Sequence, residues 1–254
     1  MYRRAGHMID THAHLTALDD PDQAVRRAAE TGVTRILTVG TDIDDCRRAL
    51  ALAERHDGVF AILGIHPHEA GTATDKELDD LRGLLAHPKA VAVGETGLDW
   101  YRDYAPRHAQ RRLFDAELAL ASELGKPVVI HTRAADDDTL AGLAGFAGVV
   151  VLHCFSSPRM LPIALARGWY VSFAGNATFP KAVDLRLAAT QVPAERILAE
   201  TDSPYLAPQP VRGKRNEPAH VVHTLASLAQ ARGEEPAALE RRIEQNAADC
   251  FGLP

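Results

Sequence analysis

The sequence predicts an α/β protein that folds as a single-domain (β/α)8 barrel of the TIM type. Short apolar or β-branched runs recur along all 254 residues, and segments with helical periodicity separate them. Several of the runs are continuously apolar, as strands covered on both faces are. The sequence also lacks a glycine-rich dinucleotide-binding loop. An open doubly wound sheet has the same alternation of strands and helices and is the alternative fold.

Eight runs are expected to form the strands of this barrel. They span residues 7–10, 33–39, 59–63, 90–94, 127–130, 149–152, 169–173 and 196–199. Between the first two runs, Asp20 predicts a helix N-cap, Pro21 fits the first helical position, and Gly32 ends the helix. Leucines at helical spacing predict a long helix that ends before Pro127; they are Leu113, Leu118, Leu120 and Leu124. Another helix is expected around residues 225–229 and a last one near 236–250.

Composition and charge exclude several classes of protein. With 46% hydrophobic and 24% charged residues the chain is not disordered. No apolar run approaches the roughly 18 residues of a membrane helix. The net charge of −6 argues against a protein that coats a nucleic-acid duplex, but it allows a pocket that binds one or two phosphates.

The expected location is the cytoplasm. No apolar stretch follows Arg3 and Arg4, so an export signal is not expected. The three cysteines are odd in number and scattered, which indicates a reducing compartment. We expect a monomer, because no exposed apolar heptad or edge strand is apparent.

Polar residues with metal-binding chemistry follow six of the expected strands. They are His12, His14, His66, Glu95, His131, His153 and Asp202. In a barrel the carboxyl ends of the strands share one face, where active sites are built. His12 and His14 are two residues apart, which on a strand directs both imidazoles to one side.

Each of these residues alone has an ordinary structural explanation, such as a hydrogen-bonded core histidine or an ion pair. Together they would be costly to bury unless a metal compensated them. Six ligands, with His66 set aside, exceed the three or four that one zinc ion takes, so two ions fit better, with Glu95 between them. Zn²⁺, Mn²⁺, Fe²⁺ and Mg²⁺ remain open. Two such ions activate water in phosphoryl transfer, and Asp202 is the expected general base.

Further residues are candidates for substrate contacts. His66 and Arg133 are placed to hold a phosphate. A basic cluster lies in the segment after the eighth strand; it comprises Arg212, Lys214 and Arg215. Arg215 either contacts a substrate backbone or braces its loop by pairing with Glu217 or Asp202. Trp100 and Tyr101 could stack on a base or simply pack.

The sequence resembles the TatD family of metal-dependent deoxyribonucleases over nearly its whole length. Seven blocks carry the resemblance, in the order and at the spacings typical of that family: residues 9–14 (IDTHAH), 64–68 (GIHPH), 94–99 (GETGLD), 127–133 (PVVIHTR), 153–156 (HCFS), 200–206 (ETDSPYL) and 215–218 (RNEP). Together the blocks are highly specific, although any one of them alone would be a modest signal.

The resemblance implies a barrel of the amidohydrolase type with two divalent metal ions, Mg²⁺, Mn²⁺ or Zn²⁺. It implies that His12, His14, Glu95 and Asp202 hold one ion, and that the second is held by Glu95, His131 and His153. The implied activity is hydrolysis of phosphodiester bonds, often from the 3′ end of single-stranded DNA, with family roles that include DNA repair. Glu95 and Asp202 are then the expected catalytic residues, and His66, Arg133 and Arg215 the substrate-binding residues.

Two other functions are weighed against a nuclease. The same barrel could hydrolyse an ester or amide, such as D-aminoacyl-tRNA, which some relatives are described as doing. Many carbonyl hydrolases bridge their metals with a modified lysine after the fourth strand, where this chain has Glu95. A non-enzymatic protein with a structural metal would need fewer ligands.

Overall fold

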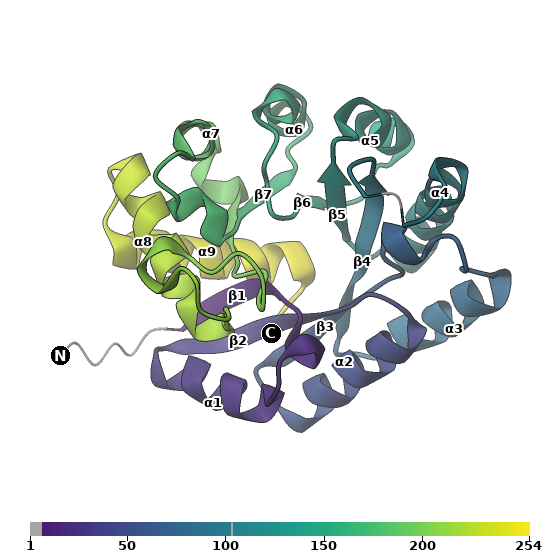
Figure 1. The fold of residues 1–254 in the computed structure, drawn as a ribbon, viewed down its shortest axis with the longest axis horizontal. Helices are drawn as coiled ribbons and strands as arrows, with labels where there is room; N and C mark the ends of the chain where they lie inside the picture. The colour runs from purple at the N-terminus through teal and green to yellow at the C-terminus, as the bar shows by residue number, and fades with distance from the viewer. Residues whose placement is uncertain (1–6, 103) are drawn as a thin grey trace. The chain divides into compact units, whose positions relative to one another are not determined.

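Eight strands form one sheet in the computed structural model of the chain, which describes residues 7–102 and 104–254. The strand order follows the sequence from β1 to β8, and an α-helix follows every strand (Figure 1). This order confirms the predicted (β/α)8 fold class. It excludes the doubly wound alternative, whose strand order reverses at a switch point. Arg3 and Arg4 lie outside the described residues.

The strands are β1 (Met8–Ala13), β2 (Val33–Gly40), β3 (Val59–Leu63), β4 (Ala90–Asp99), β5 (Val128–Arg133), β6 (Val150–Leu152), β7 (Tyr170–Phe173) and β8 (Ile197–Ala199). The helices are α1 (Pro21–Glu30), α2 (Ile43–Arg55), α3 (Asp75–Leu85), α4 (Arg107–Leu124), α5 (Asp136–Gly142), α6 (Leu161–Ala166), α7 (Val183–Gln191), α8 (Val221–Arg232) and α9 (Pro236–Phe251). Among the described helices, none combines the length and apolar character needed to cross a bilayer. All three cysteines are free thiols.

The chain packs as two compact units. The described part of Met1–Thr38 together with His153–Pro254 forms one, here named the terminal unit. Val39–Leu152 forms the other, named the central unit. In the terminal unit α9 packs against β1 and β8, and in the central unit α2 packs against β3 and α4 against β4. The expectation of a single domain stays a prediction.

Local signals in the sequence act as expected at the helix ends. The Asp20 side chain accepts a hydrogen bond from the Gln23 amide at 2.9 Å, and Pro21 is the first residue of α1. At the end of α4, Gly125 adopts a left-handed conformation with φ of 62°. The last helix ends at Phe251, one residue beyond the expected boundary.

Three strands run at least three residues further than the sequence analysis predicted, and β2 runs one residue further. β1 continues to Ala13, β4 to Asp99 and β5 to Arg133. The reason is that β4 and β5 keep pairing in parallel beyond their apolar cores, up to the pair Asp99–Arg133. Gly97 permits this close approach, because a Cβ there would lie 2.0 Å from the carbonyl oxygen of His131. His12, Glu95 and His131 therefore lie within strands rather than after them, so the predicted strand ends were wrong at these places.

The side chain of Glu117 is a buried carboxyl group that contacts the segment after β3 in the central unit. Glu117, on α4, is fully buried and accepts the Ile65 amide hydrogen at 2.7 Å. Burial raises the pKa of Glu117 to about 8, against the opposing effect of the hydrogen bond from the Ile65 amide. The folded protein therefore favours the protonated form of this side chain across the neutral range.

This pKa gives a pH-dependent stability. The preference for protonated Glu117 stabilises the fold fully below its usual pKa of 4.5, and this stability is lost as the pH rises through about 8. Glu117→Gln keeps the acceptor and cannot ionise. We expect its free energy of unfolding, relative to wild type, to increase from pH 5 to pH 9. The ceiling is about 5 kcal/mol, from roughly 1.36 kcal/mol per pKa unit.

Urea denaturation at the two pH values measures this difference. Glu123→Gln, at an exposed position near the end of the same helix, is the matched control and should show no such increase. An equal difference between Glu117→Gln and wild type at pH 5 and pH 9 would contradict the assignment.

Candidate metal centre

Four candidate ligands converge in the terminal unit; this β1–β8 cluster comprises His12, His14, His153 and Asp202. The Nε2 atoms of His12 and His14 are 3.4 Å apart, and His14 Nε2 is also 3.4 Å from Asp202 Oδ1. The ring of His153 stacks on that of His12, with centroids 3.9 Å apart. Ligand atoms of His12, His153 and Asp202 all lie within 4.8 Å of one another. Residues distant in sequence are thus brought within the reach of one metal ion.

Backbone hydrogen bonds join the ends of β1 and β8 and so position this cluster. The amide of Asp202 donates to the carbonyl of His12 at 2.9 Å, and the amide of His14 donates to Ser203 at 2.7 Å. Behind them, the buried Asp10 carboxyl group accepts hydrogen bonds from the amide and hydroxyl of Thr201. These contacts fix the segment after β8 against β1.

The charge on Asp202 is maintained by its imidazole neighbours. Burial alone would raise the pKa of Asp202, but the hydrogen bond from His14 and the nearby charges of His153, His14 and His12 outweigh burial and lower it. The side chain is therefore a carboxylate at neutral pH. Glu200 orients His153 by facing its Nδ1 at 2.9 Å, which makes Nε2 the ligand atom in this orientation.

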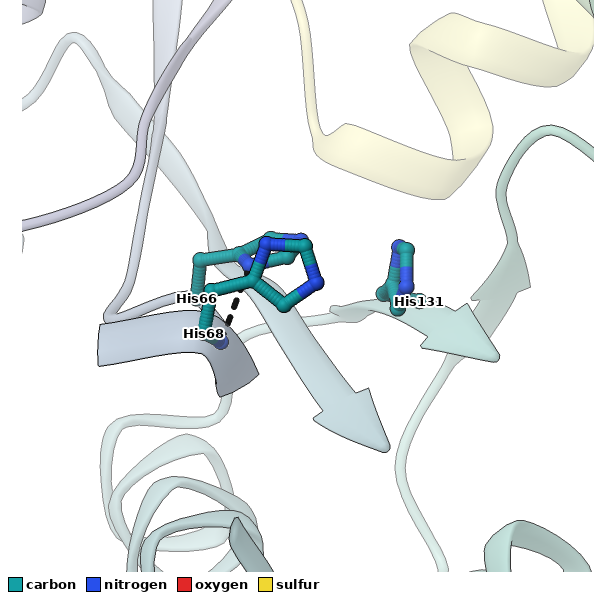
Figure 2. A group of neighbouring side chains, drawn as sticks. All are labelled: His66, His68 and His131. Carbon is teal, nitrogen blue, oxygen red and sulfur yellow. Dashed lines mark hydrogen bonds between the residues drawn. The ribbon is translucent and has the colours of Figure 1, made fainter. Parts of the chain in front are cut away.

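The central unit holds a second group of side chains; this β4–β5 cluster comprises His66, His68, Glu95, Asp99 and His131. His66 and His68 lie in the segment after β3 and face His131 on β5 (Figure 2). One ligand atom from each of these three histidines lies within 4.8 Å of the other two. Glu95 Oε1 is 2.8 Å from His131 Nδ1 and 3.6 Å from His66 Nε2.

Asp99 is a member of this cluster that the sequence analysis did not single out. Its Oδ2 atom is 2.8 Å from His68 Nε2 and 3.2 Å from His131 Nε2. Its Oδ1 atom accepts the amides of Tyr101 and Arg102 at 2.8 and 2.9 Å. Burial would raise the pKa of Asp99, but the hydrogen bonds hold it well below its usual range. Carboxylate oxygens therefore face both ring nitrogens of His131, Glu95 at Nδ1 and Asp99 at Nε2, and together they fix the orientation of the ring.

His66 is set as a neutral hydrogen-bond donor. Its Nδ1 accepts the backbone amide of His68 at 3.1 Å, the dashed line in Figure 2, so the proton is on Nε2. Burial lowers the pKa of His66 to about 4, with smaller contributions from His131 and His68, although the Glu95 carboxylate opposes the shift. A neutral donor beside carboxylates suits a phosphate oxygen.

The donor sets of both clusters fit divalent metal ions. Each unit combines imidazole nitrogens with carboxylate oxygens, the set that Zn²⁺ and Mn²⁺ accept. Most of the candidate ligands are buried. The carboxylates of Asp99 and Glu200 face imidazoles of the two clusters, as the carboxylate partners of metal-binding histidines do. Metal binding would compensate the concentration of buried polar groups in each unit.

The two arginines predicted to contact substrate, Arg133 and Arg215, have different surroundings. The Arg133 guanidinium, at the end of β5, lies 4.0 Å from the centroid of the Tyr101 ring. Arg215 donates to the Ala17 carbonyl and lies 3.5 Å from the Asp19 carboxylate. Arg215 thus braces its loop, but through partners other than those proposed from the sequence, because Glu217 pairs with Arg27. Its role toward a substrate stays a prediction.

Comparisons with known proteins agree on one family. The family model described as TatD related DNase matches residues 9–252. An uncharacterized metal-dependent hydrolase TatD of Mycobacterium tuberculosis is 39% identical, over 97% of this chain and 98% of the relative. A 3′-5′ ssDNA/RNA exonuclease TatD of Cronobacter sakazakii is 37% identical, over 96% and 97%. The solved structure of YJJV, a TatD homologue from Escherichia coli, superposes with a TM-score of 0.92 at 30% identity, over 97% and 98%.

The support that Asp99 gives to His131 predicts a metal-binding defect. Asp99→Asn removes the carboxylate that faces Nε2 of His131 and helps to orient the ring, so we expect metal affinity to fall by about 10- to 100-fold. Competition with a chromophoric chelator for Mn²⁺ measures the affinity. Asp138→Asn, which alters a carboxylate bound to Trp100 on the same unit, is the matched control. Equal affinities in the two variants and wild type would show that Asp99 does not support a ligand.

Proposed function

Because the chain belongs to the TatD-related DNase family of metal-dependent hydrolases, we propose that it shortens single-stranded DNA or RNA from the 3′ end by hydrolysing phosphodiester bonds. The observation that carries this proposal is the gathering of imidazoles and carboxylates at the strand ends of each unit. Relatives of similar length at 35–37% identity are named 3′-5′ ssDNA/RNA exonucleases.

Two divalent ions, Mg²⁺, Mn²⁺ or Zn²⁺, are the proposed cofactors. The proposed ligands are His12, His14, Glu95, His131, His153 and Asp202. When bound, such ions supply Lewis acidity that makes water a better nucleophile and neutralises the charge on the phosphate. The support comes from the donor chemistry of each cluster and from the carboxylates that orient His131 and His153.

The protein's own residues then position the reactants and move the proton. Asp202, held as a carboxylate by its imidazole neighbours, accepts a proton from the attacking water as general base. His66 donates its Nε2–H to a phosphate oxygen, since its other nitrogen is occupied by the His68 amide. Arg133 presents a guanidinium, whose planar fork matches a phosphate. Arg215 contacts the substrate backbone further along the strand.

The proposal also covers the oligomeric state and the cellular location of the enzyme. We expect it to act as a monomer in the cytoplasm, where its three free cysteines stay reduced. Size-exclusion chromatography with light scattering tests the monomer.

A 5′-labelled single-stranded DNA oligonucleotide tests the activity directly. With Mg²⁺, Mn²⁺ or Zn²⁺ we expect a ladder that shortens from the 3′ end. EDTA and Glu95→Ala should each abolish it, because both remove the metal from the centre. Asp202→Asn should lower kcat by at least about 100-fold, since the general base is lost.

Three outcomes would count against this mechanism. Activity that persists in metal-stripped protein excludes metal catalysis. An Asp202→Asn effect confined to KM excludes its role as base. Intact metal binding without cleavage of any oligonucleotide turns the proposal to ester substrates, beginning with D-aminoacyl-tRNA.

The role of Arg133 gives a separate expectation. Arg133→Ala removes a phosphate contact without touching a proposed ligand, so KM for DNA should rise by about 10-fold while metal content stays constant. Steady-state kinetics and metal analysis of the same samples measure both quantities. A large fall in bound metal would instead make Arg133 a support of the metal ligands.

A further inference from the structure

Two tyrosines of the central unit expose their rings to solvent. Tyr101 and Tyr104 are each 63% exposed, whereas Phe114, Phe155 and Phe173 are buried. An exposed aromatic ring keeps a large apolar face in water, so neighbouring exposed rings point to a binding surface. Both rings belong to the segment between β4 and α4.

Direct contacts attach these rings to the β4–β5 cluster. The Tyr101 amide donates to Asp99 Oδ1 at 2.8 Å. The Tyr104 ring meets the His68 ring edge to face, with centroids 4.8 Å apart and planes at 88°. His68 in turn faces Asp99 Oδ2 at 2.8 Å. The tyrosines therefore border the group of residues proposed to hold metal and phosphate.

Arginines accompany the rings. The Arg133 guanidinium lies 4.0 Å from the Tyr101 ring centroid, and Arg102 lies 5.4 Å from Tyr101 and 5.9 Å from Tyr104. Cation–π contacts of this kind hold a ring in place while most of its area stays exposed. In the part of the chain that the structure describes, neither arginine is within ion-pair distance of an acidic side chain. The patch therefore joins flat apolar surface with positive charge.

Trp100, in the same segment, is a useful comparison because its ring is packed against other side chains. Its indole N–H donates to Asp138 at 2.7 Å. The guanidinium groups of Arg107 and Arg111 lie over its ring at 4.7 and 5.4 Å. Both the polar atom and the face of Trp100 are thus occupied by neighbours within the central unit, so packing explains Trp100 and does not explain Tyr101 or Tyr104.

We propose that Tyr101 and Tyr104 form a stacking subsite for unpaired nucleobases, with Arg102 and Arg133 beside them for the adjoining phosphates. This inference rests on the proposed function and adds the feature that selects single strands. Every base has a flat face, so stacking accepts any sequence, but bases inside a duplex already stack on each other. The two guanidinium groups over the rings favour a nucleic acid over an apolar peptide, because they offer positive charge to the phosphates beside a stacked base.

The test compares two single-stranded octamers of equal charge. One is an octathymidylate and the other carries abasic residues in place of all but the labelled 5′ nucleotide. For wild type we expect kcat/KM to be about 10-fold or more higher for the octathymidylate. In Tyr101→Leu and Tyr104→Leu this preference should shrink, and in the double variant it should fall to within about 2-fold. Because both substrates meet the same sample, the ratio does not depend on the folded fraction.

Two further variants sharpen the comparison. Tyr101→Trp keeps a flat ring and should retain the preference, which a loss of local structure would not allow. Leu187→Ser, at an exposed position on α7 of the terminal unit, should leave the preference as in wild type.

Each remaining outcome is decisive. A preference that persists in the double variant, or equal cleavage of both octamers by wild type, overturns the stacking subsite while leaving the nuclease in place. Wild type that cleaves neither octamer with any metal overturns the proposed function itself. The two failures are therefore distinguishable.

Discussion

Buried carboxylates that face imidazoles are the interactions on which both clusters depend. In the terminal unit Glu200 faces His153, and in the central unit Asp99 faces His131 and His68. A histidine ring has two nitrogens, and a metal ligand must present the correct one. A carboxylate that faces a ring nitrogen fixes the orientation of the ring before any ion binds. The strand ends are thus prepared for metal chemistry by groups that need not touch the metal.

This arrangement requires a rigid backbone, which each unit supplies in its own way. In the terminal unit the Asp10 carboxyl group accepts two hydrogen bonds from Thr201, so the segment carrying Asp202 is fixed to β1. In the central unit β4 and β5 continue side by side through the cluster, where Gly97 lets the backbones approach. Glu117 reaches the Ile65 amide from α4, one residue before His66. In both units a buried acid orders the chain immediately beside a candidate ligand.

The sequence predicted the fold and the candidate ligands better than it predicted their supports. Runs such as the one before His131 are apolar and short, so their periodicity and the polar residue that follows were visible in the chain itself. The extension of β4 to Asp99 was not, because it arises from pairing with β5 rather than from β-propensity. Asp99 is the last residue of the GETGLD motif, but its role depends on His68 and His131, which lie beside it only in the folded chain. A carboxylate a few residues past a candidate ligand was the available signal.

The aromatic residues also have roles that depend on tertiary contacts and were not visible in the sequence. They bear, too, on how a chain of negative net charge could bind a nucleic acid. Trp100 and Tyr101 are adjacent in sequence, but Asp138 and two arginines occupy the first while the second stays exposed. A net charge of −6 argues against binding that relies on many phosphate contacts along a nucleic acid. A few phosphate contacts combined with stacking on rings would supply affinity that depends less steeply on salt than binding to many phosphates. An acidic net charge and the proposed nucleic-acid substrate are then compatible, because the proposed contacts are few and lie at the strand ends.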